Sequence, residues 1–284
     1  MTQIEVKLNP DVTPAGSDLS VVNAARRSFN TRSEWDIVKI PETYYNFDTN
    51  SMQTEVELNR VLKEKDKRLL EFLARGMTAA DFQEFLDDVA ESHSYLDDAA
   101  TTGEKSLAPD ITELLWQWRN TPTHDTPFNH TFISFEVQAP IFVRAQLVKH
   151  EYLIMSEFSR RYITDDIKFY EPDVWRKAAE NKKQGSLDEG INPEYNPAYD
   201  NSSALHAYRQ ALDYGVAPEL ARMLLPQSTM TEWTWSGTLG AFAKMCTLRC
   251  HPEAQYEARV VANKVYEYLK EYYPVGAKAL VEGV

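Results

Sequence analysis

Residues 124–162 read HDTPFNHTFISFEVQAPIFVRAQLVKHEYLIMSEFSRRY, and this stretch is the most informative part of the chain. It opens with a turn that contains two histidines, and apolar and polar residues then alternate over residues 131–138. Alternation with a period of two is typical of a half-buried strand, so we expect Ile133, Phe135 and Val137 on the buried face. The stretch therefore predicts a rigid strand that frames the polar groups around it.

A helix is expected directly after this strand. Pro140 suits the first turn of a helix, because its missing N–H group needs no partner there, and we expect the helix to run to about Tyr152. On such a helix Gln146, Lys149 and His150 have the spacing i, i+3 and i+4, and residues at this spacing share one face. The sequence thus predicts that an amide, an ammonium and an imidazole group lie together.

The composition is that of a soluble globular protein. The chain has 284 residues, of which 43% are hydrophobic and 26% are charged, and we expect one domain over residues 1–284. It contains no run of about 18 apolar residues that would cross a membrane, and its N-terminus lacks the pattern of a signal peptide. The cysteines are Cys246 and Cys250, so we expect no disulfide framework and a reducing compartment, the cytoplasm.

The negative charge is concentrated in one segment. The formal net charge of −13 does not suit nucleic-acid binding, which normally uses a basic face. Residues 77–121 hold ten acidic and two basic side chains, and so contribute −8 (2 − 10). We interpret this segment as an acidic helical insertion. Its predicted features are an N-cap at Thr78, a helical face of Phe82, Phe85, Leu86 and Val89, and a second helix at about 111–119.

The rest of the chain predicts a mixture of helices and strands without repeats. The expected elements are a short strand or loop at 20–29 leading into a helix, a helix at about 54–75 that ends at Gly76, a polar surface excursion at 176–203, a helix from Pro218 that Pro226 stops, a strand at 228–235, and helices at about 239–250 and 252–273.

Several common chemistries lack their motifs. The chain has no GxGxxG, no GxxxxGK[ST] and no GxSxG. Cys246 and Cys250 lie one helical turn apart without two further ligands at zinc-site spacing, so we interpret them as small core residues. His124 and His130 share one turn, where hydrogen bonding is a more common role than metal binding. No metal site is predicted.

A set of amide and guanidinium groups suits a planar anionic ligand. Gln146 can both donate and accept, which matches the edge of a nucleobase. Arg161, Arg222 and Arg249 can grip a phosphate or polarise a carbonyl group, because guanidinium is a permanently charged planar fork. Each of these arginines, taken alone, also fits an ion pair at the protein surface. The residues by themselves therefore leave open whether the chain binds a small anion.

The opening stretch resembles the signature of the flavin-dependent thymidylate synthase family, especially its virus-encoded members. That signature reads Arg-His-Arg, two residues, Ser, one residue, Asn-Glu, one residue, Ser, one residue, Arg-Tyr. Five of the nine signature residues match here and four differ. The nine positions hold Lys149, His150, Glu151, Ile154, Ser156, Glu157, Ser159, Arg161 and Tyr162.

Further blocks extend the resemblance in the family's order from about residue 20 to residue 272. They are VVNAARRSF at 21–29, the flavin-contacting turn HDTPFNH at 124–130, the helix APIFVRAQ at 139–146, the phosphate-side helix with Ala221-Arg222 and Leu225-Pro226, and the closing motif LRCHPEAQYEAR at 248–259.

The resemblance implies a fold and a reaction. The fold is α/β (α+β), with a central, mostly antiparallel sheet flanked by helices, in a homotetramer whose active sites form between subunits. The reaction transfers a methylene group from methylenetetrahydrofolate to C5 of dUMP, and FAD that NADPH has reduced supplies the hydride. Arg249 stands at the position of the substrate-activating arginine and would be the catalytic residue. Neither cysteine is a persuasive thiolate nucleophile.

The family's binding residues carry over position by position. The implied dUMP site consists of Gln146, Lys149, Glu157, Ser159, Arg160, Arg161, Arg222 and Arg249. The implied FAD site consists of His124, Thr126, Lys149, His150, Glu151, Glu157, Thr238 and Lys244.

The implied FAD site departs from the family more than the dUMP site does. Lys149 replaces an arginine and loses its bidentate fork, and Glu151 replaces an arginine and reverses the charge. Compact members lack a counterpart of residues 77–121. The other departures are Ile154, Ser156, Thr238, Gly240, Lys244 and Glu253.

Two alternative functions remain open. A relative with the same fold can act as a pyrimidine-nucleotide hydroxymethylase on dUMP or dCMP, in which water rather than hydride captures the one-carbon intermediate. A second alternative is a catalytically inactive nucleotide-binding protein that kept the substrate pocket and lost the flavin.

Overall fold

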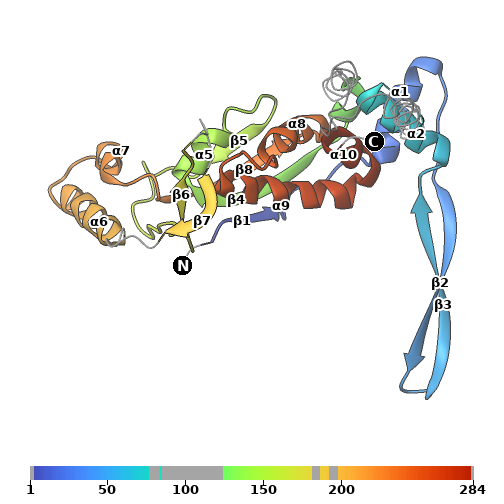
Figure 1. Ribbon diagram of the computed structural model, residues 1–284, viewed down its shortest axis with the longest axis horizontal. Coiled ribbons are helices and arrows are strands. Elements are labelled where there is room, and N and C mark those ends of the chain that lie inside the picture. The colour runs from blue at the N-terminus through green and yellow to red at the C-terminus, as the bar shows by residue number, and fades with distance from the viewer. Residues whose placement is uncertain (1–2, 77–83, 85–123, 181–185, 192–197, 283–284) are drawn as a thin grey trace, which may run out of the picture. The chain divides into compact units, whose positions relative to one another are not determined.

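The chain folds into two compact units. The computed structural model describes residues 3–76, 84, 124–180, 186–191 and 198–282 (Figure 1). Unit 1 consists of Met1–Ala15 and Thr131–Glu271, and unit 2 consists of Gly16–His130 and Tyr272–Val284. The predicted acidic helices of residues 77–121 lie outside the described residues.

Unit 1 is built on a four-stranded antiparallel sheet with the strand order β1-β4-β8-β5. The central pair, β4 and β8, is in register from Ile133 opposite Gly237 to Pro140 opposite Met230. The strands are β1 (Glu5–Leu8), β4 (Ile133–Pro140), β8 (Met230–Gly237) and β5 (Ile154–Glu157). The predicted strand of the opening stretch and the strand predicted at 228–235 are both confirmed, and so is the α+β class.

The core of unit 1 is aromatic. Ile133, Phe135 and Val137 are completely buried, as their alternation predicted. The ring of Phe242 in α8 (Leu239–Arg249) packs edge-on against Phe135 at 5.1 Å and against Trp235 at 5.3 Å between ring centroids. Such T-shaped aromatic contacts add to the free energy gained from apolar burial. Helix α9 (Tyr256–Tyr272) buries a second apolar stripe in this unit.

The helix predicted after Pro140 is shorter than expected. Helix α5 (Ile141–Leu147) ends five residues before Tyr152, so the expectation that Gln146, Lys149 and His150 share one helical face is wrong. Tyr152 has a φ of 63°, in the left-handed region that a bulky residue rarely adopts. This turn brings β5 into its pairing with β8, and the tertiary pairing overrides the helical pattern.

The predicted surface excursion at 176–203 is mostly exposed in its described residues, and it contains regular structure there. It contains the hairpin of β6 (Trp175–Ala178) and β7 (Ser186–Ile191) and the start of α6 (Ala198–Asp213). Its polar composition hid strands whose side chains are mostly exposed. The segment predicted from Pro218 is helical, as α7 (Pro218–Ala221) and the 3₁₀ turn η3 (Arg222–Leu224). Helix α9 begins at Tyr256, later than predicted.

Unit 2 contains three helices among its described residues and a long hairpin. The helices are α1 (Asp18–Arg26), α2 (Glu64–Arg75) and α10 (Pro274–Val281), the 3₁₀ turns are η1 (Arg27–Phe29) and η2 (Thr126–Asn129), and the strands are β2 (Asp36–Asn46) and β3 (Ser51–Val61). Two predictions are wrong here. Residues 20–29 are helical rather than a strand or loop, and 54–61 form a strand rather than the start of a helix. Gly76 does end α2, with a φ of 77°.

A buried carboxylate joins the first and last helices of unit 2. Asp18, at the start of α1, accepts hydrogen bonds from the backbone N–H groups of Val275 (2.8 Å) and Gly276 (2.9 Å) at the start of α10. These donors favour the charged form, but burial outweighs them and raises the pKa of Asp18 to about 6. The carboxylate therefore satisfies the N-terminus of α10 at the cost of its own desolvation.

Replacing Asp18 by Asn should change the pH dependence of stability. Folding raises the pKa of Asp18 from 3.8 to about 6. The contribution of Asp18 to the free energy of unfolding is therefore fully present below about pH 3.8 and is lost as the pH rises through about 6. The difference corresponds to roughly 3 kcal/mol. Between about pH 4 and pH 7 we expect the free energy of unfolding of the wild type to fall by up to this amount relative to Asp18→Asn, measured by urea titration. The exposed Asp11→Asn change serves as the control. Identical pH dependence in Asp18→Asn and the wild type would contradict this account.

Candidate active site

A polar cavity of unit 1 has a volume of about 750 Å³, and the predicted catalytic arginine lines it. Arg249 is the last residue of α8, and Gln146 and Lys149 come from α5 and the turn that follows it. These three predicted site residues line this cavity, which we call the Arg249 cavity. The structure thus brings together an amide, an ammonium and a guanidinium group, although not on the helical face that the sequence suggested.

A histidine orients Arg249. The Nε of Arg249 donates a hydrogen bond of 3.0 Å to Nε2 of His150, so this imidazole must be neutral at that nitrogen. Burial and, to a lesser degree, the charge of Arg249 lower the pKa of His150. The predicted FAD ligand His150 therefore contacts the predicted dUMP ligand Arg249 directly. This contact leaves the two NH₂ groups of the guanidinium for a ligand.

A chain of polar side chains forms another wall of the Arg249 cavity. Gln146 donates to Gln255, and Nε2 of Gln255 donates to Glu257 at 3.1 Å. Glu257 forms a buried ion pair with Arg176 and also accepts from the hydroxyl of Tyr170 at 3.4 Å. Burial, followed by the charge of Glu257, raises the pKa of Tyr170. Because a carboxylate only accepts, this chain fixes which end of each amide faces its neighbour.

Sequence reasoning missed the residues of this chain. Gln255 and Glu257 stand in the closing motif, but no role was assigned to them, and Arg176 lies in the segment predicted to be a surface excursion. The sequence does show an acid, Glu257, two residues after an amide, Gln255, at the start of a predicted helix. This spacing gives no indication that Arg176 is the partner of Glu257. The ion pair forms because Arg176 in β6 lies beside Glu257 at the start of α9, and this contact is visible only in the structure.

The other predicted dUMP ligands line a second cavity of unit 1, of about 400 Å³, which we call the Arg222 cavity. Glu157 forms an ion pair of 2.7 Å with Arg144 and accepts from Thr231 at 2.9 Å. Nε of Arg161 donates to the hydroxyl of Ser159 at 3.3 Å. The predicted ligands in this cavity are Glu157, Ser159, Arg160, Arg161 and Arg222.

The predicted dUMP site is therefore divided within one chain. The Arg249 cavity and the Arg222 cavity have no lining residue in common. The first offers an amide and a guanidinium suited to a base, and the second offers three arginines suited to a phosphate. Each cavity supplies half of the groups that a nucleotide monophosphate needs.

The predicted flavin-contacting turn lines a cavity of about 790 Å³ in unit 2, which we call the His124 cavity. His124 and Thr126 belong to its wall, and the His124 ring stacks on Phe72 at 6.4 Å between centroids. Arg26, Lys65 and Arg68, which the sequence analysis did not assign, also line it. No acidic side chain is among its described lining residues. A cationic cavity of this size suits an elongated ligand with a negatively charged centre.

The remaining predicted flavin ligands belong to unit 1. Lys149 lines the Arg249 cavity and Glu157 lines the Arg222 cavity, whereas Glu151, Thr238 and Lys244 line neither. Thr238 caps α8 by accepting from the N–H of Ala241 at 3.2 Å. Lys244 and Glu151 are exposed. Their assignment as FAD ligands stays a prediction.

The two cysteines differ in their surroundings: Cys246 is not placed to act as a nucleophile, whereas Cys250 is half-buried and its hydrogen bond with Cys246 lowers the pKa of its thiol. Cys246 is completely buried, its thiol points to the carbonyl oxygen of Ala262 at 3.7 Å, and burial raises its pKa. Neither Cys246 nor Cys250 forms a disulfide. Among the residues that the structure describes, no three His, Cys, Asp or Glu side chains cluster as metal ligands. None of the helices in the same described part is long and apolar enough to span a bilayer.

The fold and its cavities define an α+β protein whose cavities are lined by amide and guanidinium groups. The sequence profile described as "Thymidylate synthase complementing protein" matches residues 12–275. The chain belongs to this family, that of the flavin-dependent thymidylate synthases, and this confirms the resemblance seen in its motifs.

Named relatives agree with this assignment, and a solved structure shares the fold. A flavin-dependent thymidylate synthase of Thermus thermophilus is 36% identical over 184 residues, which are 63% of this chain and 67% of the relative. That of Gluconobacter oxydans is 33% identical over 193 residues, covering 63% and 62%. A crystal structure of the UMP/dUMP methylase PolB from Streptomyces cacaoi with 5-Br dUMP has a TM-score of 0.63 at 22% identity, covering 99% of this chain and 96% of that one. At this identity the last similarity shows the shared fold alone.

Replacing Glu257 by Ala should destabilise unit 1 strongly. The side chains of Glu257 and Arg176 are only 4% and 16% exposed, so the variant leaves a mostly buried guanidinium without its carboxylate. Loss of one partner of a buried ion pair costs about 3–5 kcal/mol. The control is Glu253→Ala, an exposed position four residues away, with an expected change within about 0.5 kcal/mol. Urea unfolding measures both, and a loss below about 1 kcal/mol in Glu257→Ala would show that this ion pair is not structural.

Proposed function

We propose that this protein is a flavin-dependent thymidylate synthase that methylates C5 of dUMP to give dTMP. The observation that supports this most directly is Arg249, oriented by a neutral His150 on the wall of a cavity that also holds Gln146. An arginine fixed in this way stabilises the negative charge that develops on a pyrimidine ring when C5 acts as the nucleophile. No thiolate is required for this activation.

The other residues of the two unit 1 cavities bind and orient the nucleotide. Gln146 meets the polar edge of the base. Arg161 and Arg222 bind the phosphate as permanently charged forks, with Ser159 as an additional donor. Glu157, held by Arg144, accepts from a ribose hydroxyl group. Lys149 and Arg160 add positive charge beside the nucleotide.

FAD is the flavin that we propose for the His124 cavity. The cavity's volume of about 790 Å³ and its Lys65 and Arg68 fit an elongated cofactor with a pyrophosphate at its centre. When bound, reduced FAD supplies the hydride that completes the methyl group, with NADPH and methylenetetrahydrofolate as co-substrates. His124 and Thr126 hold the flavin by hydrogen bonds, and the Phe72 ring limits the position of the imidazole.

We propose further that the active form is a homotetramer with shared active sites. The division of the dUMP ligands between two cavities of one chain supports this, because a second copy can bring its Arg222 cavity to the Arg249 cavity of the first. The reaction takes place in the cytoplasm, or in the host cytoplasm if the protein is virus-encoded, where its two free thiols stay reduced.

Product identification tests this function. Purified protein should bind FAD and convert dUMP to dTMP with NADPH and methylenetetrahydrofolate, as followed by mass spectrometry. Arg249→Ala should lower kcat by about 10²–10³-fold with the fold intact by circular dichroism, because it removes the group that stabilises the developing charge. The exposed Arg209→Ala change on α6 is the matched control and should keep full activity.

Other products would overturn the proposal. A 5-hydroxymethyl product from dUMP or dCMP would identify a hydroxymethylase. Binding of dUMP without turnover under any reductant would identify a nucleotide-binding relative. Retained activity in Arg249→Ala would refute the role of this arginine.

A further inference from the structure

The hairpin of β2 and β3 is not explained by the proposed reaction. Its two strands of eleven residues pair along their whole length and form a sheet of their own (Figure 1). An isolated two-stranded ribbon is marginally stable in water, because each face lacks a layer to pack against. A ribbon of this length therefore indicates a surface that another part of an assembly covers.

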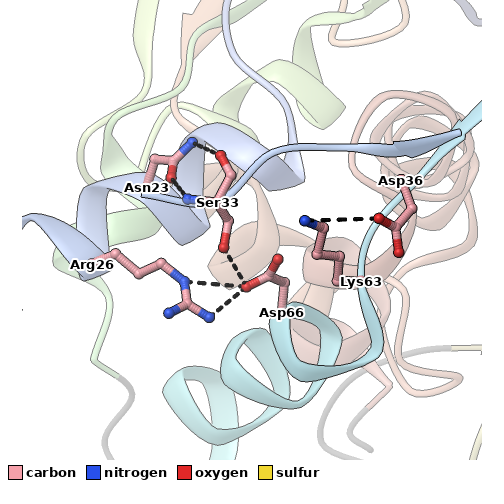
Figure 2. Close-up of polar contacts among 6 residues, drawn as sticks. All are labelled: Asn23, Arg26, Ser33, Asp36, Lys63 and Asp66. Atoms are coloured by element: carbon pink, nitrogen blue, oxygen red, sulfur yellow. Dashed lines mark hydrogen bonds and ion pairs between the residues drawn. The ribbon is translucent and has the colours of Figure 1, made fainter. Parts of the chain in front are cut away.

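The base of the hairpin is firmly attached to unit 2. Figure 2 shows that Ser33, just before β2, exchanges two hydrogen bonds with the side chain of Asn23 in α1, at 2.8 and 3.2 Å. The hydroxyl of Ser33 also donates to the buried Asp66 of α2 at 2.8 Å, and Arg26 pairs with the same carboxylate at 2.5 Å. The ribbon thus starts from a fixed point and is not a loose loop.

The two faces of the ribbon differ in charge. Directly opposite residues share a face, so the register places Ile37, Pro41, Tyr45, Met52, Val56 and Leu58 on one side, which we call the apolar face. Its charged members are Lys39 and Arg60, both basic. The opposite face carries four carboxylates, those of Asp36, Glu42, Glu55 and Glu57.

The apolar face is exposed along its whole length. Ile37 is 66% exposed, Leu58 61% and Val56 56%. Large apolar side chains at this exposure, contiguous on one face, are typical of an interaction surface rather than of scattered surface residues. The acidic face holds apolar residues as well, but they are interrupted by the carboxylates.

The chemical character of the apolar face changes from the base of the hairpin to its tip. The two cations are near the base, where Arg60 is opposite Ile37 and Lys39 is opposite Leu58. The aromatic rings are near the tip, where Tyr45 and Phe47 pack edge to face at 5.2 Å between centroids. The middle is formed by Pro41 opposite Val56. The cations at the base and the aromatic rings at the tip are therefore complementary, because cations bind favourably over aromatic rings.

We infer that the apolar face packs against the same face of a second copy of this chain, with the base of one hairpin over the tip of the other. A two-fold axis across the strands at Val56 produces this arrangement and places Arg60 of each copy over the Tyr45 end of the other. The opposite orientation would stack cations on cations. If an apolar face packed on an acidic face, each copy at the end of the assembly would keep a free face, and further copies would add without limit. The two-fold contact instead forms a closed pair.

This inference does not depend on the proposed reaction. The two-fold contact adds a layer to each ribbon and removes its apolar side chains from water, which supplies the stabilisation that the isolated hairpin lacks. It also links copies through unit 2, independently of the cavities of unit 1.

Cysteine cross-linking of the full-length protein tests the contact. Because Val56 lies at the proposed axis, Val56→Cys should place two thiols opposite each other, and mild oxidation should convert most of the protein to a covalent dimer on a non-reducing gel. Ile40→Cys, on the acidic face and 44% exposed, is the matched control and should cross-link at least tenfold less. Cys250→Ser in both variants removes the partly accessible native thiol.

A charge reversal provides a second readout that does not alter the cross-linked position. Arg60→Glu in the Val56→Cys protein should slow dimer formation several-fold, and circular dichroism should show an intact fold because Arg60 is exposed in the single chain. Equal cross-linking of Val56→Cys and Ile40→Cys would overturn the inference. So would a Val56→Cys protein that stays monomeric on the gel, since the face would then be covered by another segment or another protein.

Discussion

The antiparallel pairing of β4 with β8 fixes the geometry on which the candidate site depends. The register runs from Ile133 opposite Gly237 to Pro140 opposite Met230, so β4 ends where β8 begins. Helix α5 leaves the sheet from that end, and α8 leaves from the other. The eleven residues of α8 rise about 16 Å, which is enough to return Arg249 toward the turn after α5. The hydrogen bond between Arg249 and His150 follows from this return.

The sequence was most informative where local pattern and tertiary structure agree. Alternation predicted the buried face of β4, because Ile133, Phe135 and Val137 meet a true core. It was least informative where a local signal competes with pairing. Residues 54–61 have helix-forming charged residues but are held by eight cross-strand pairs in the β2–β3 hairpin, from Thr54 opposite Thr43 to Val61 opposite Asp36. The helical pattern after Leu147 yields in the same way to the pairing of β5 with β8.

The candidate site was predictable in its members but not in its arrangement. Motif order identified Arg249, Gln146 and the Arg222 segment, since each occupies a position of a family signature. It gave no indication that these residues line two separate cavities, or that Arg176 and Glu257 form a buried ion pair beside Gln146. Those facts depend on contacts across 81 residues of sequence between Arg176 and Glu257, which no local pattern encodes.

The most direct test of the account is whether one active site uses Arg249 of one copy and Arg222 of another. Arg249→Ala and Arg222→Ala chains with different tags are each expected to be inactive, and doubly tagged hetero-oligomers from co-expression should regain about a quarter of the wild-type dTMP formation per site, because random assembly pairs two intact halves at that frequency. Hetero-oligomers no more active than the two variants alone would contradict the account, since both arginines would then act within a single chain.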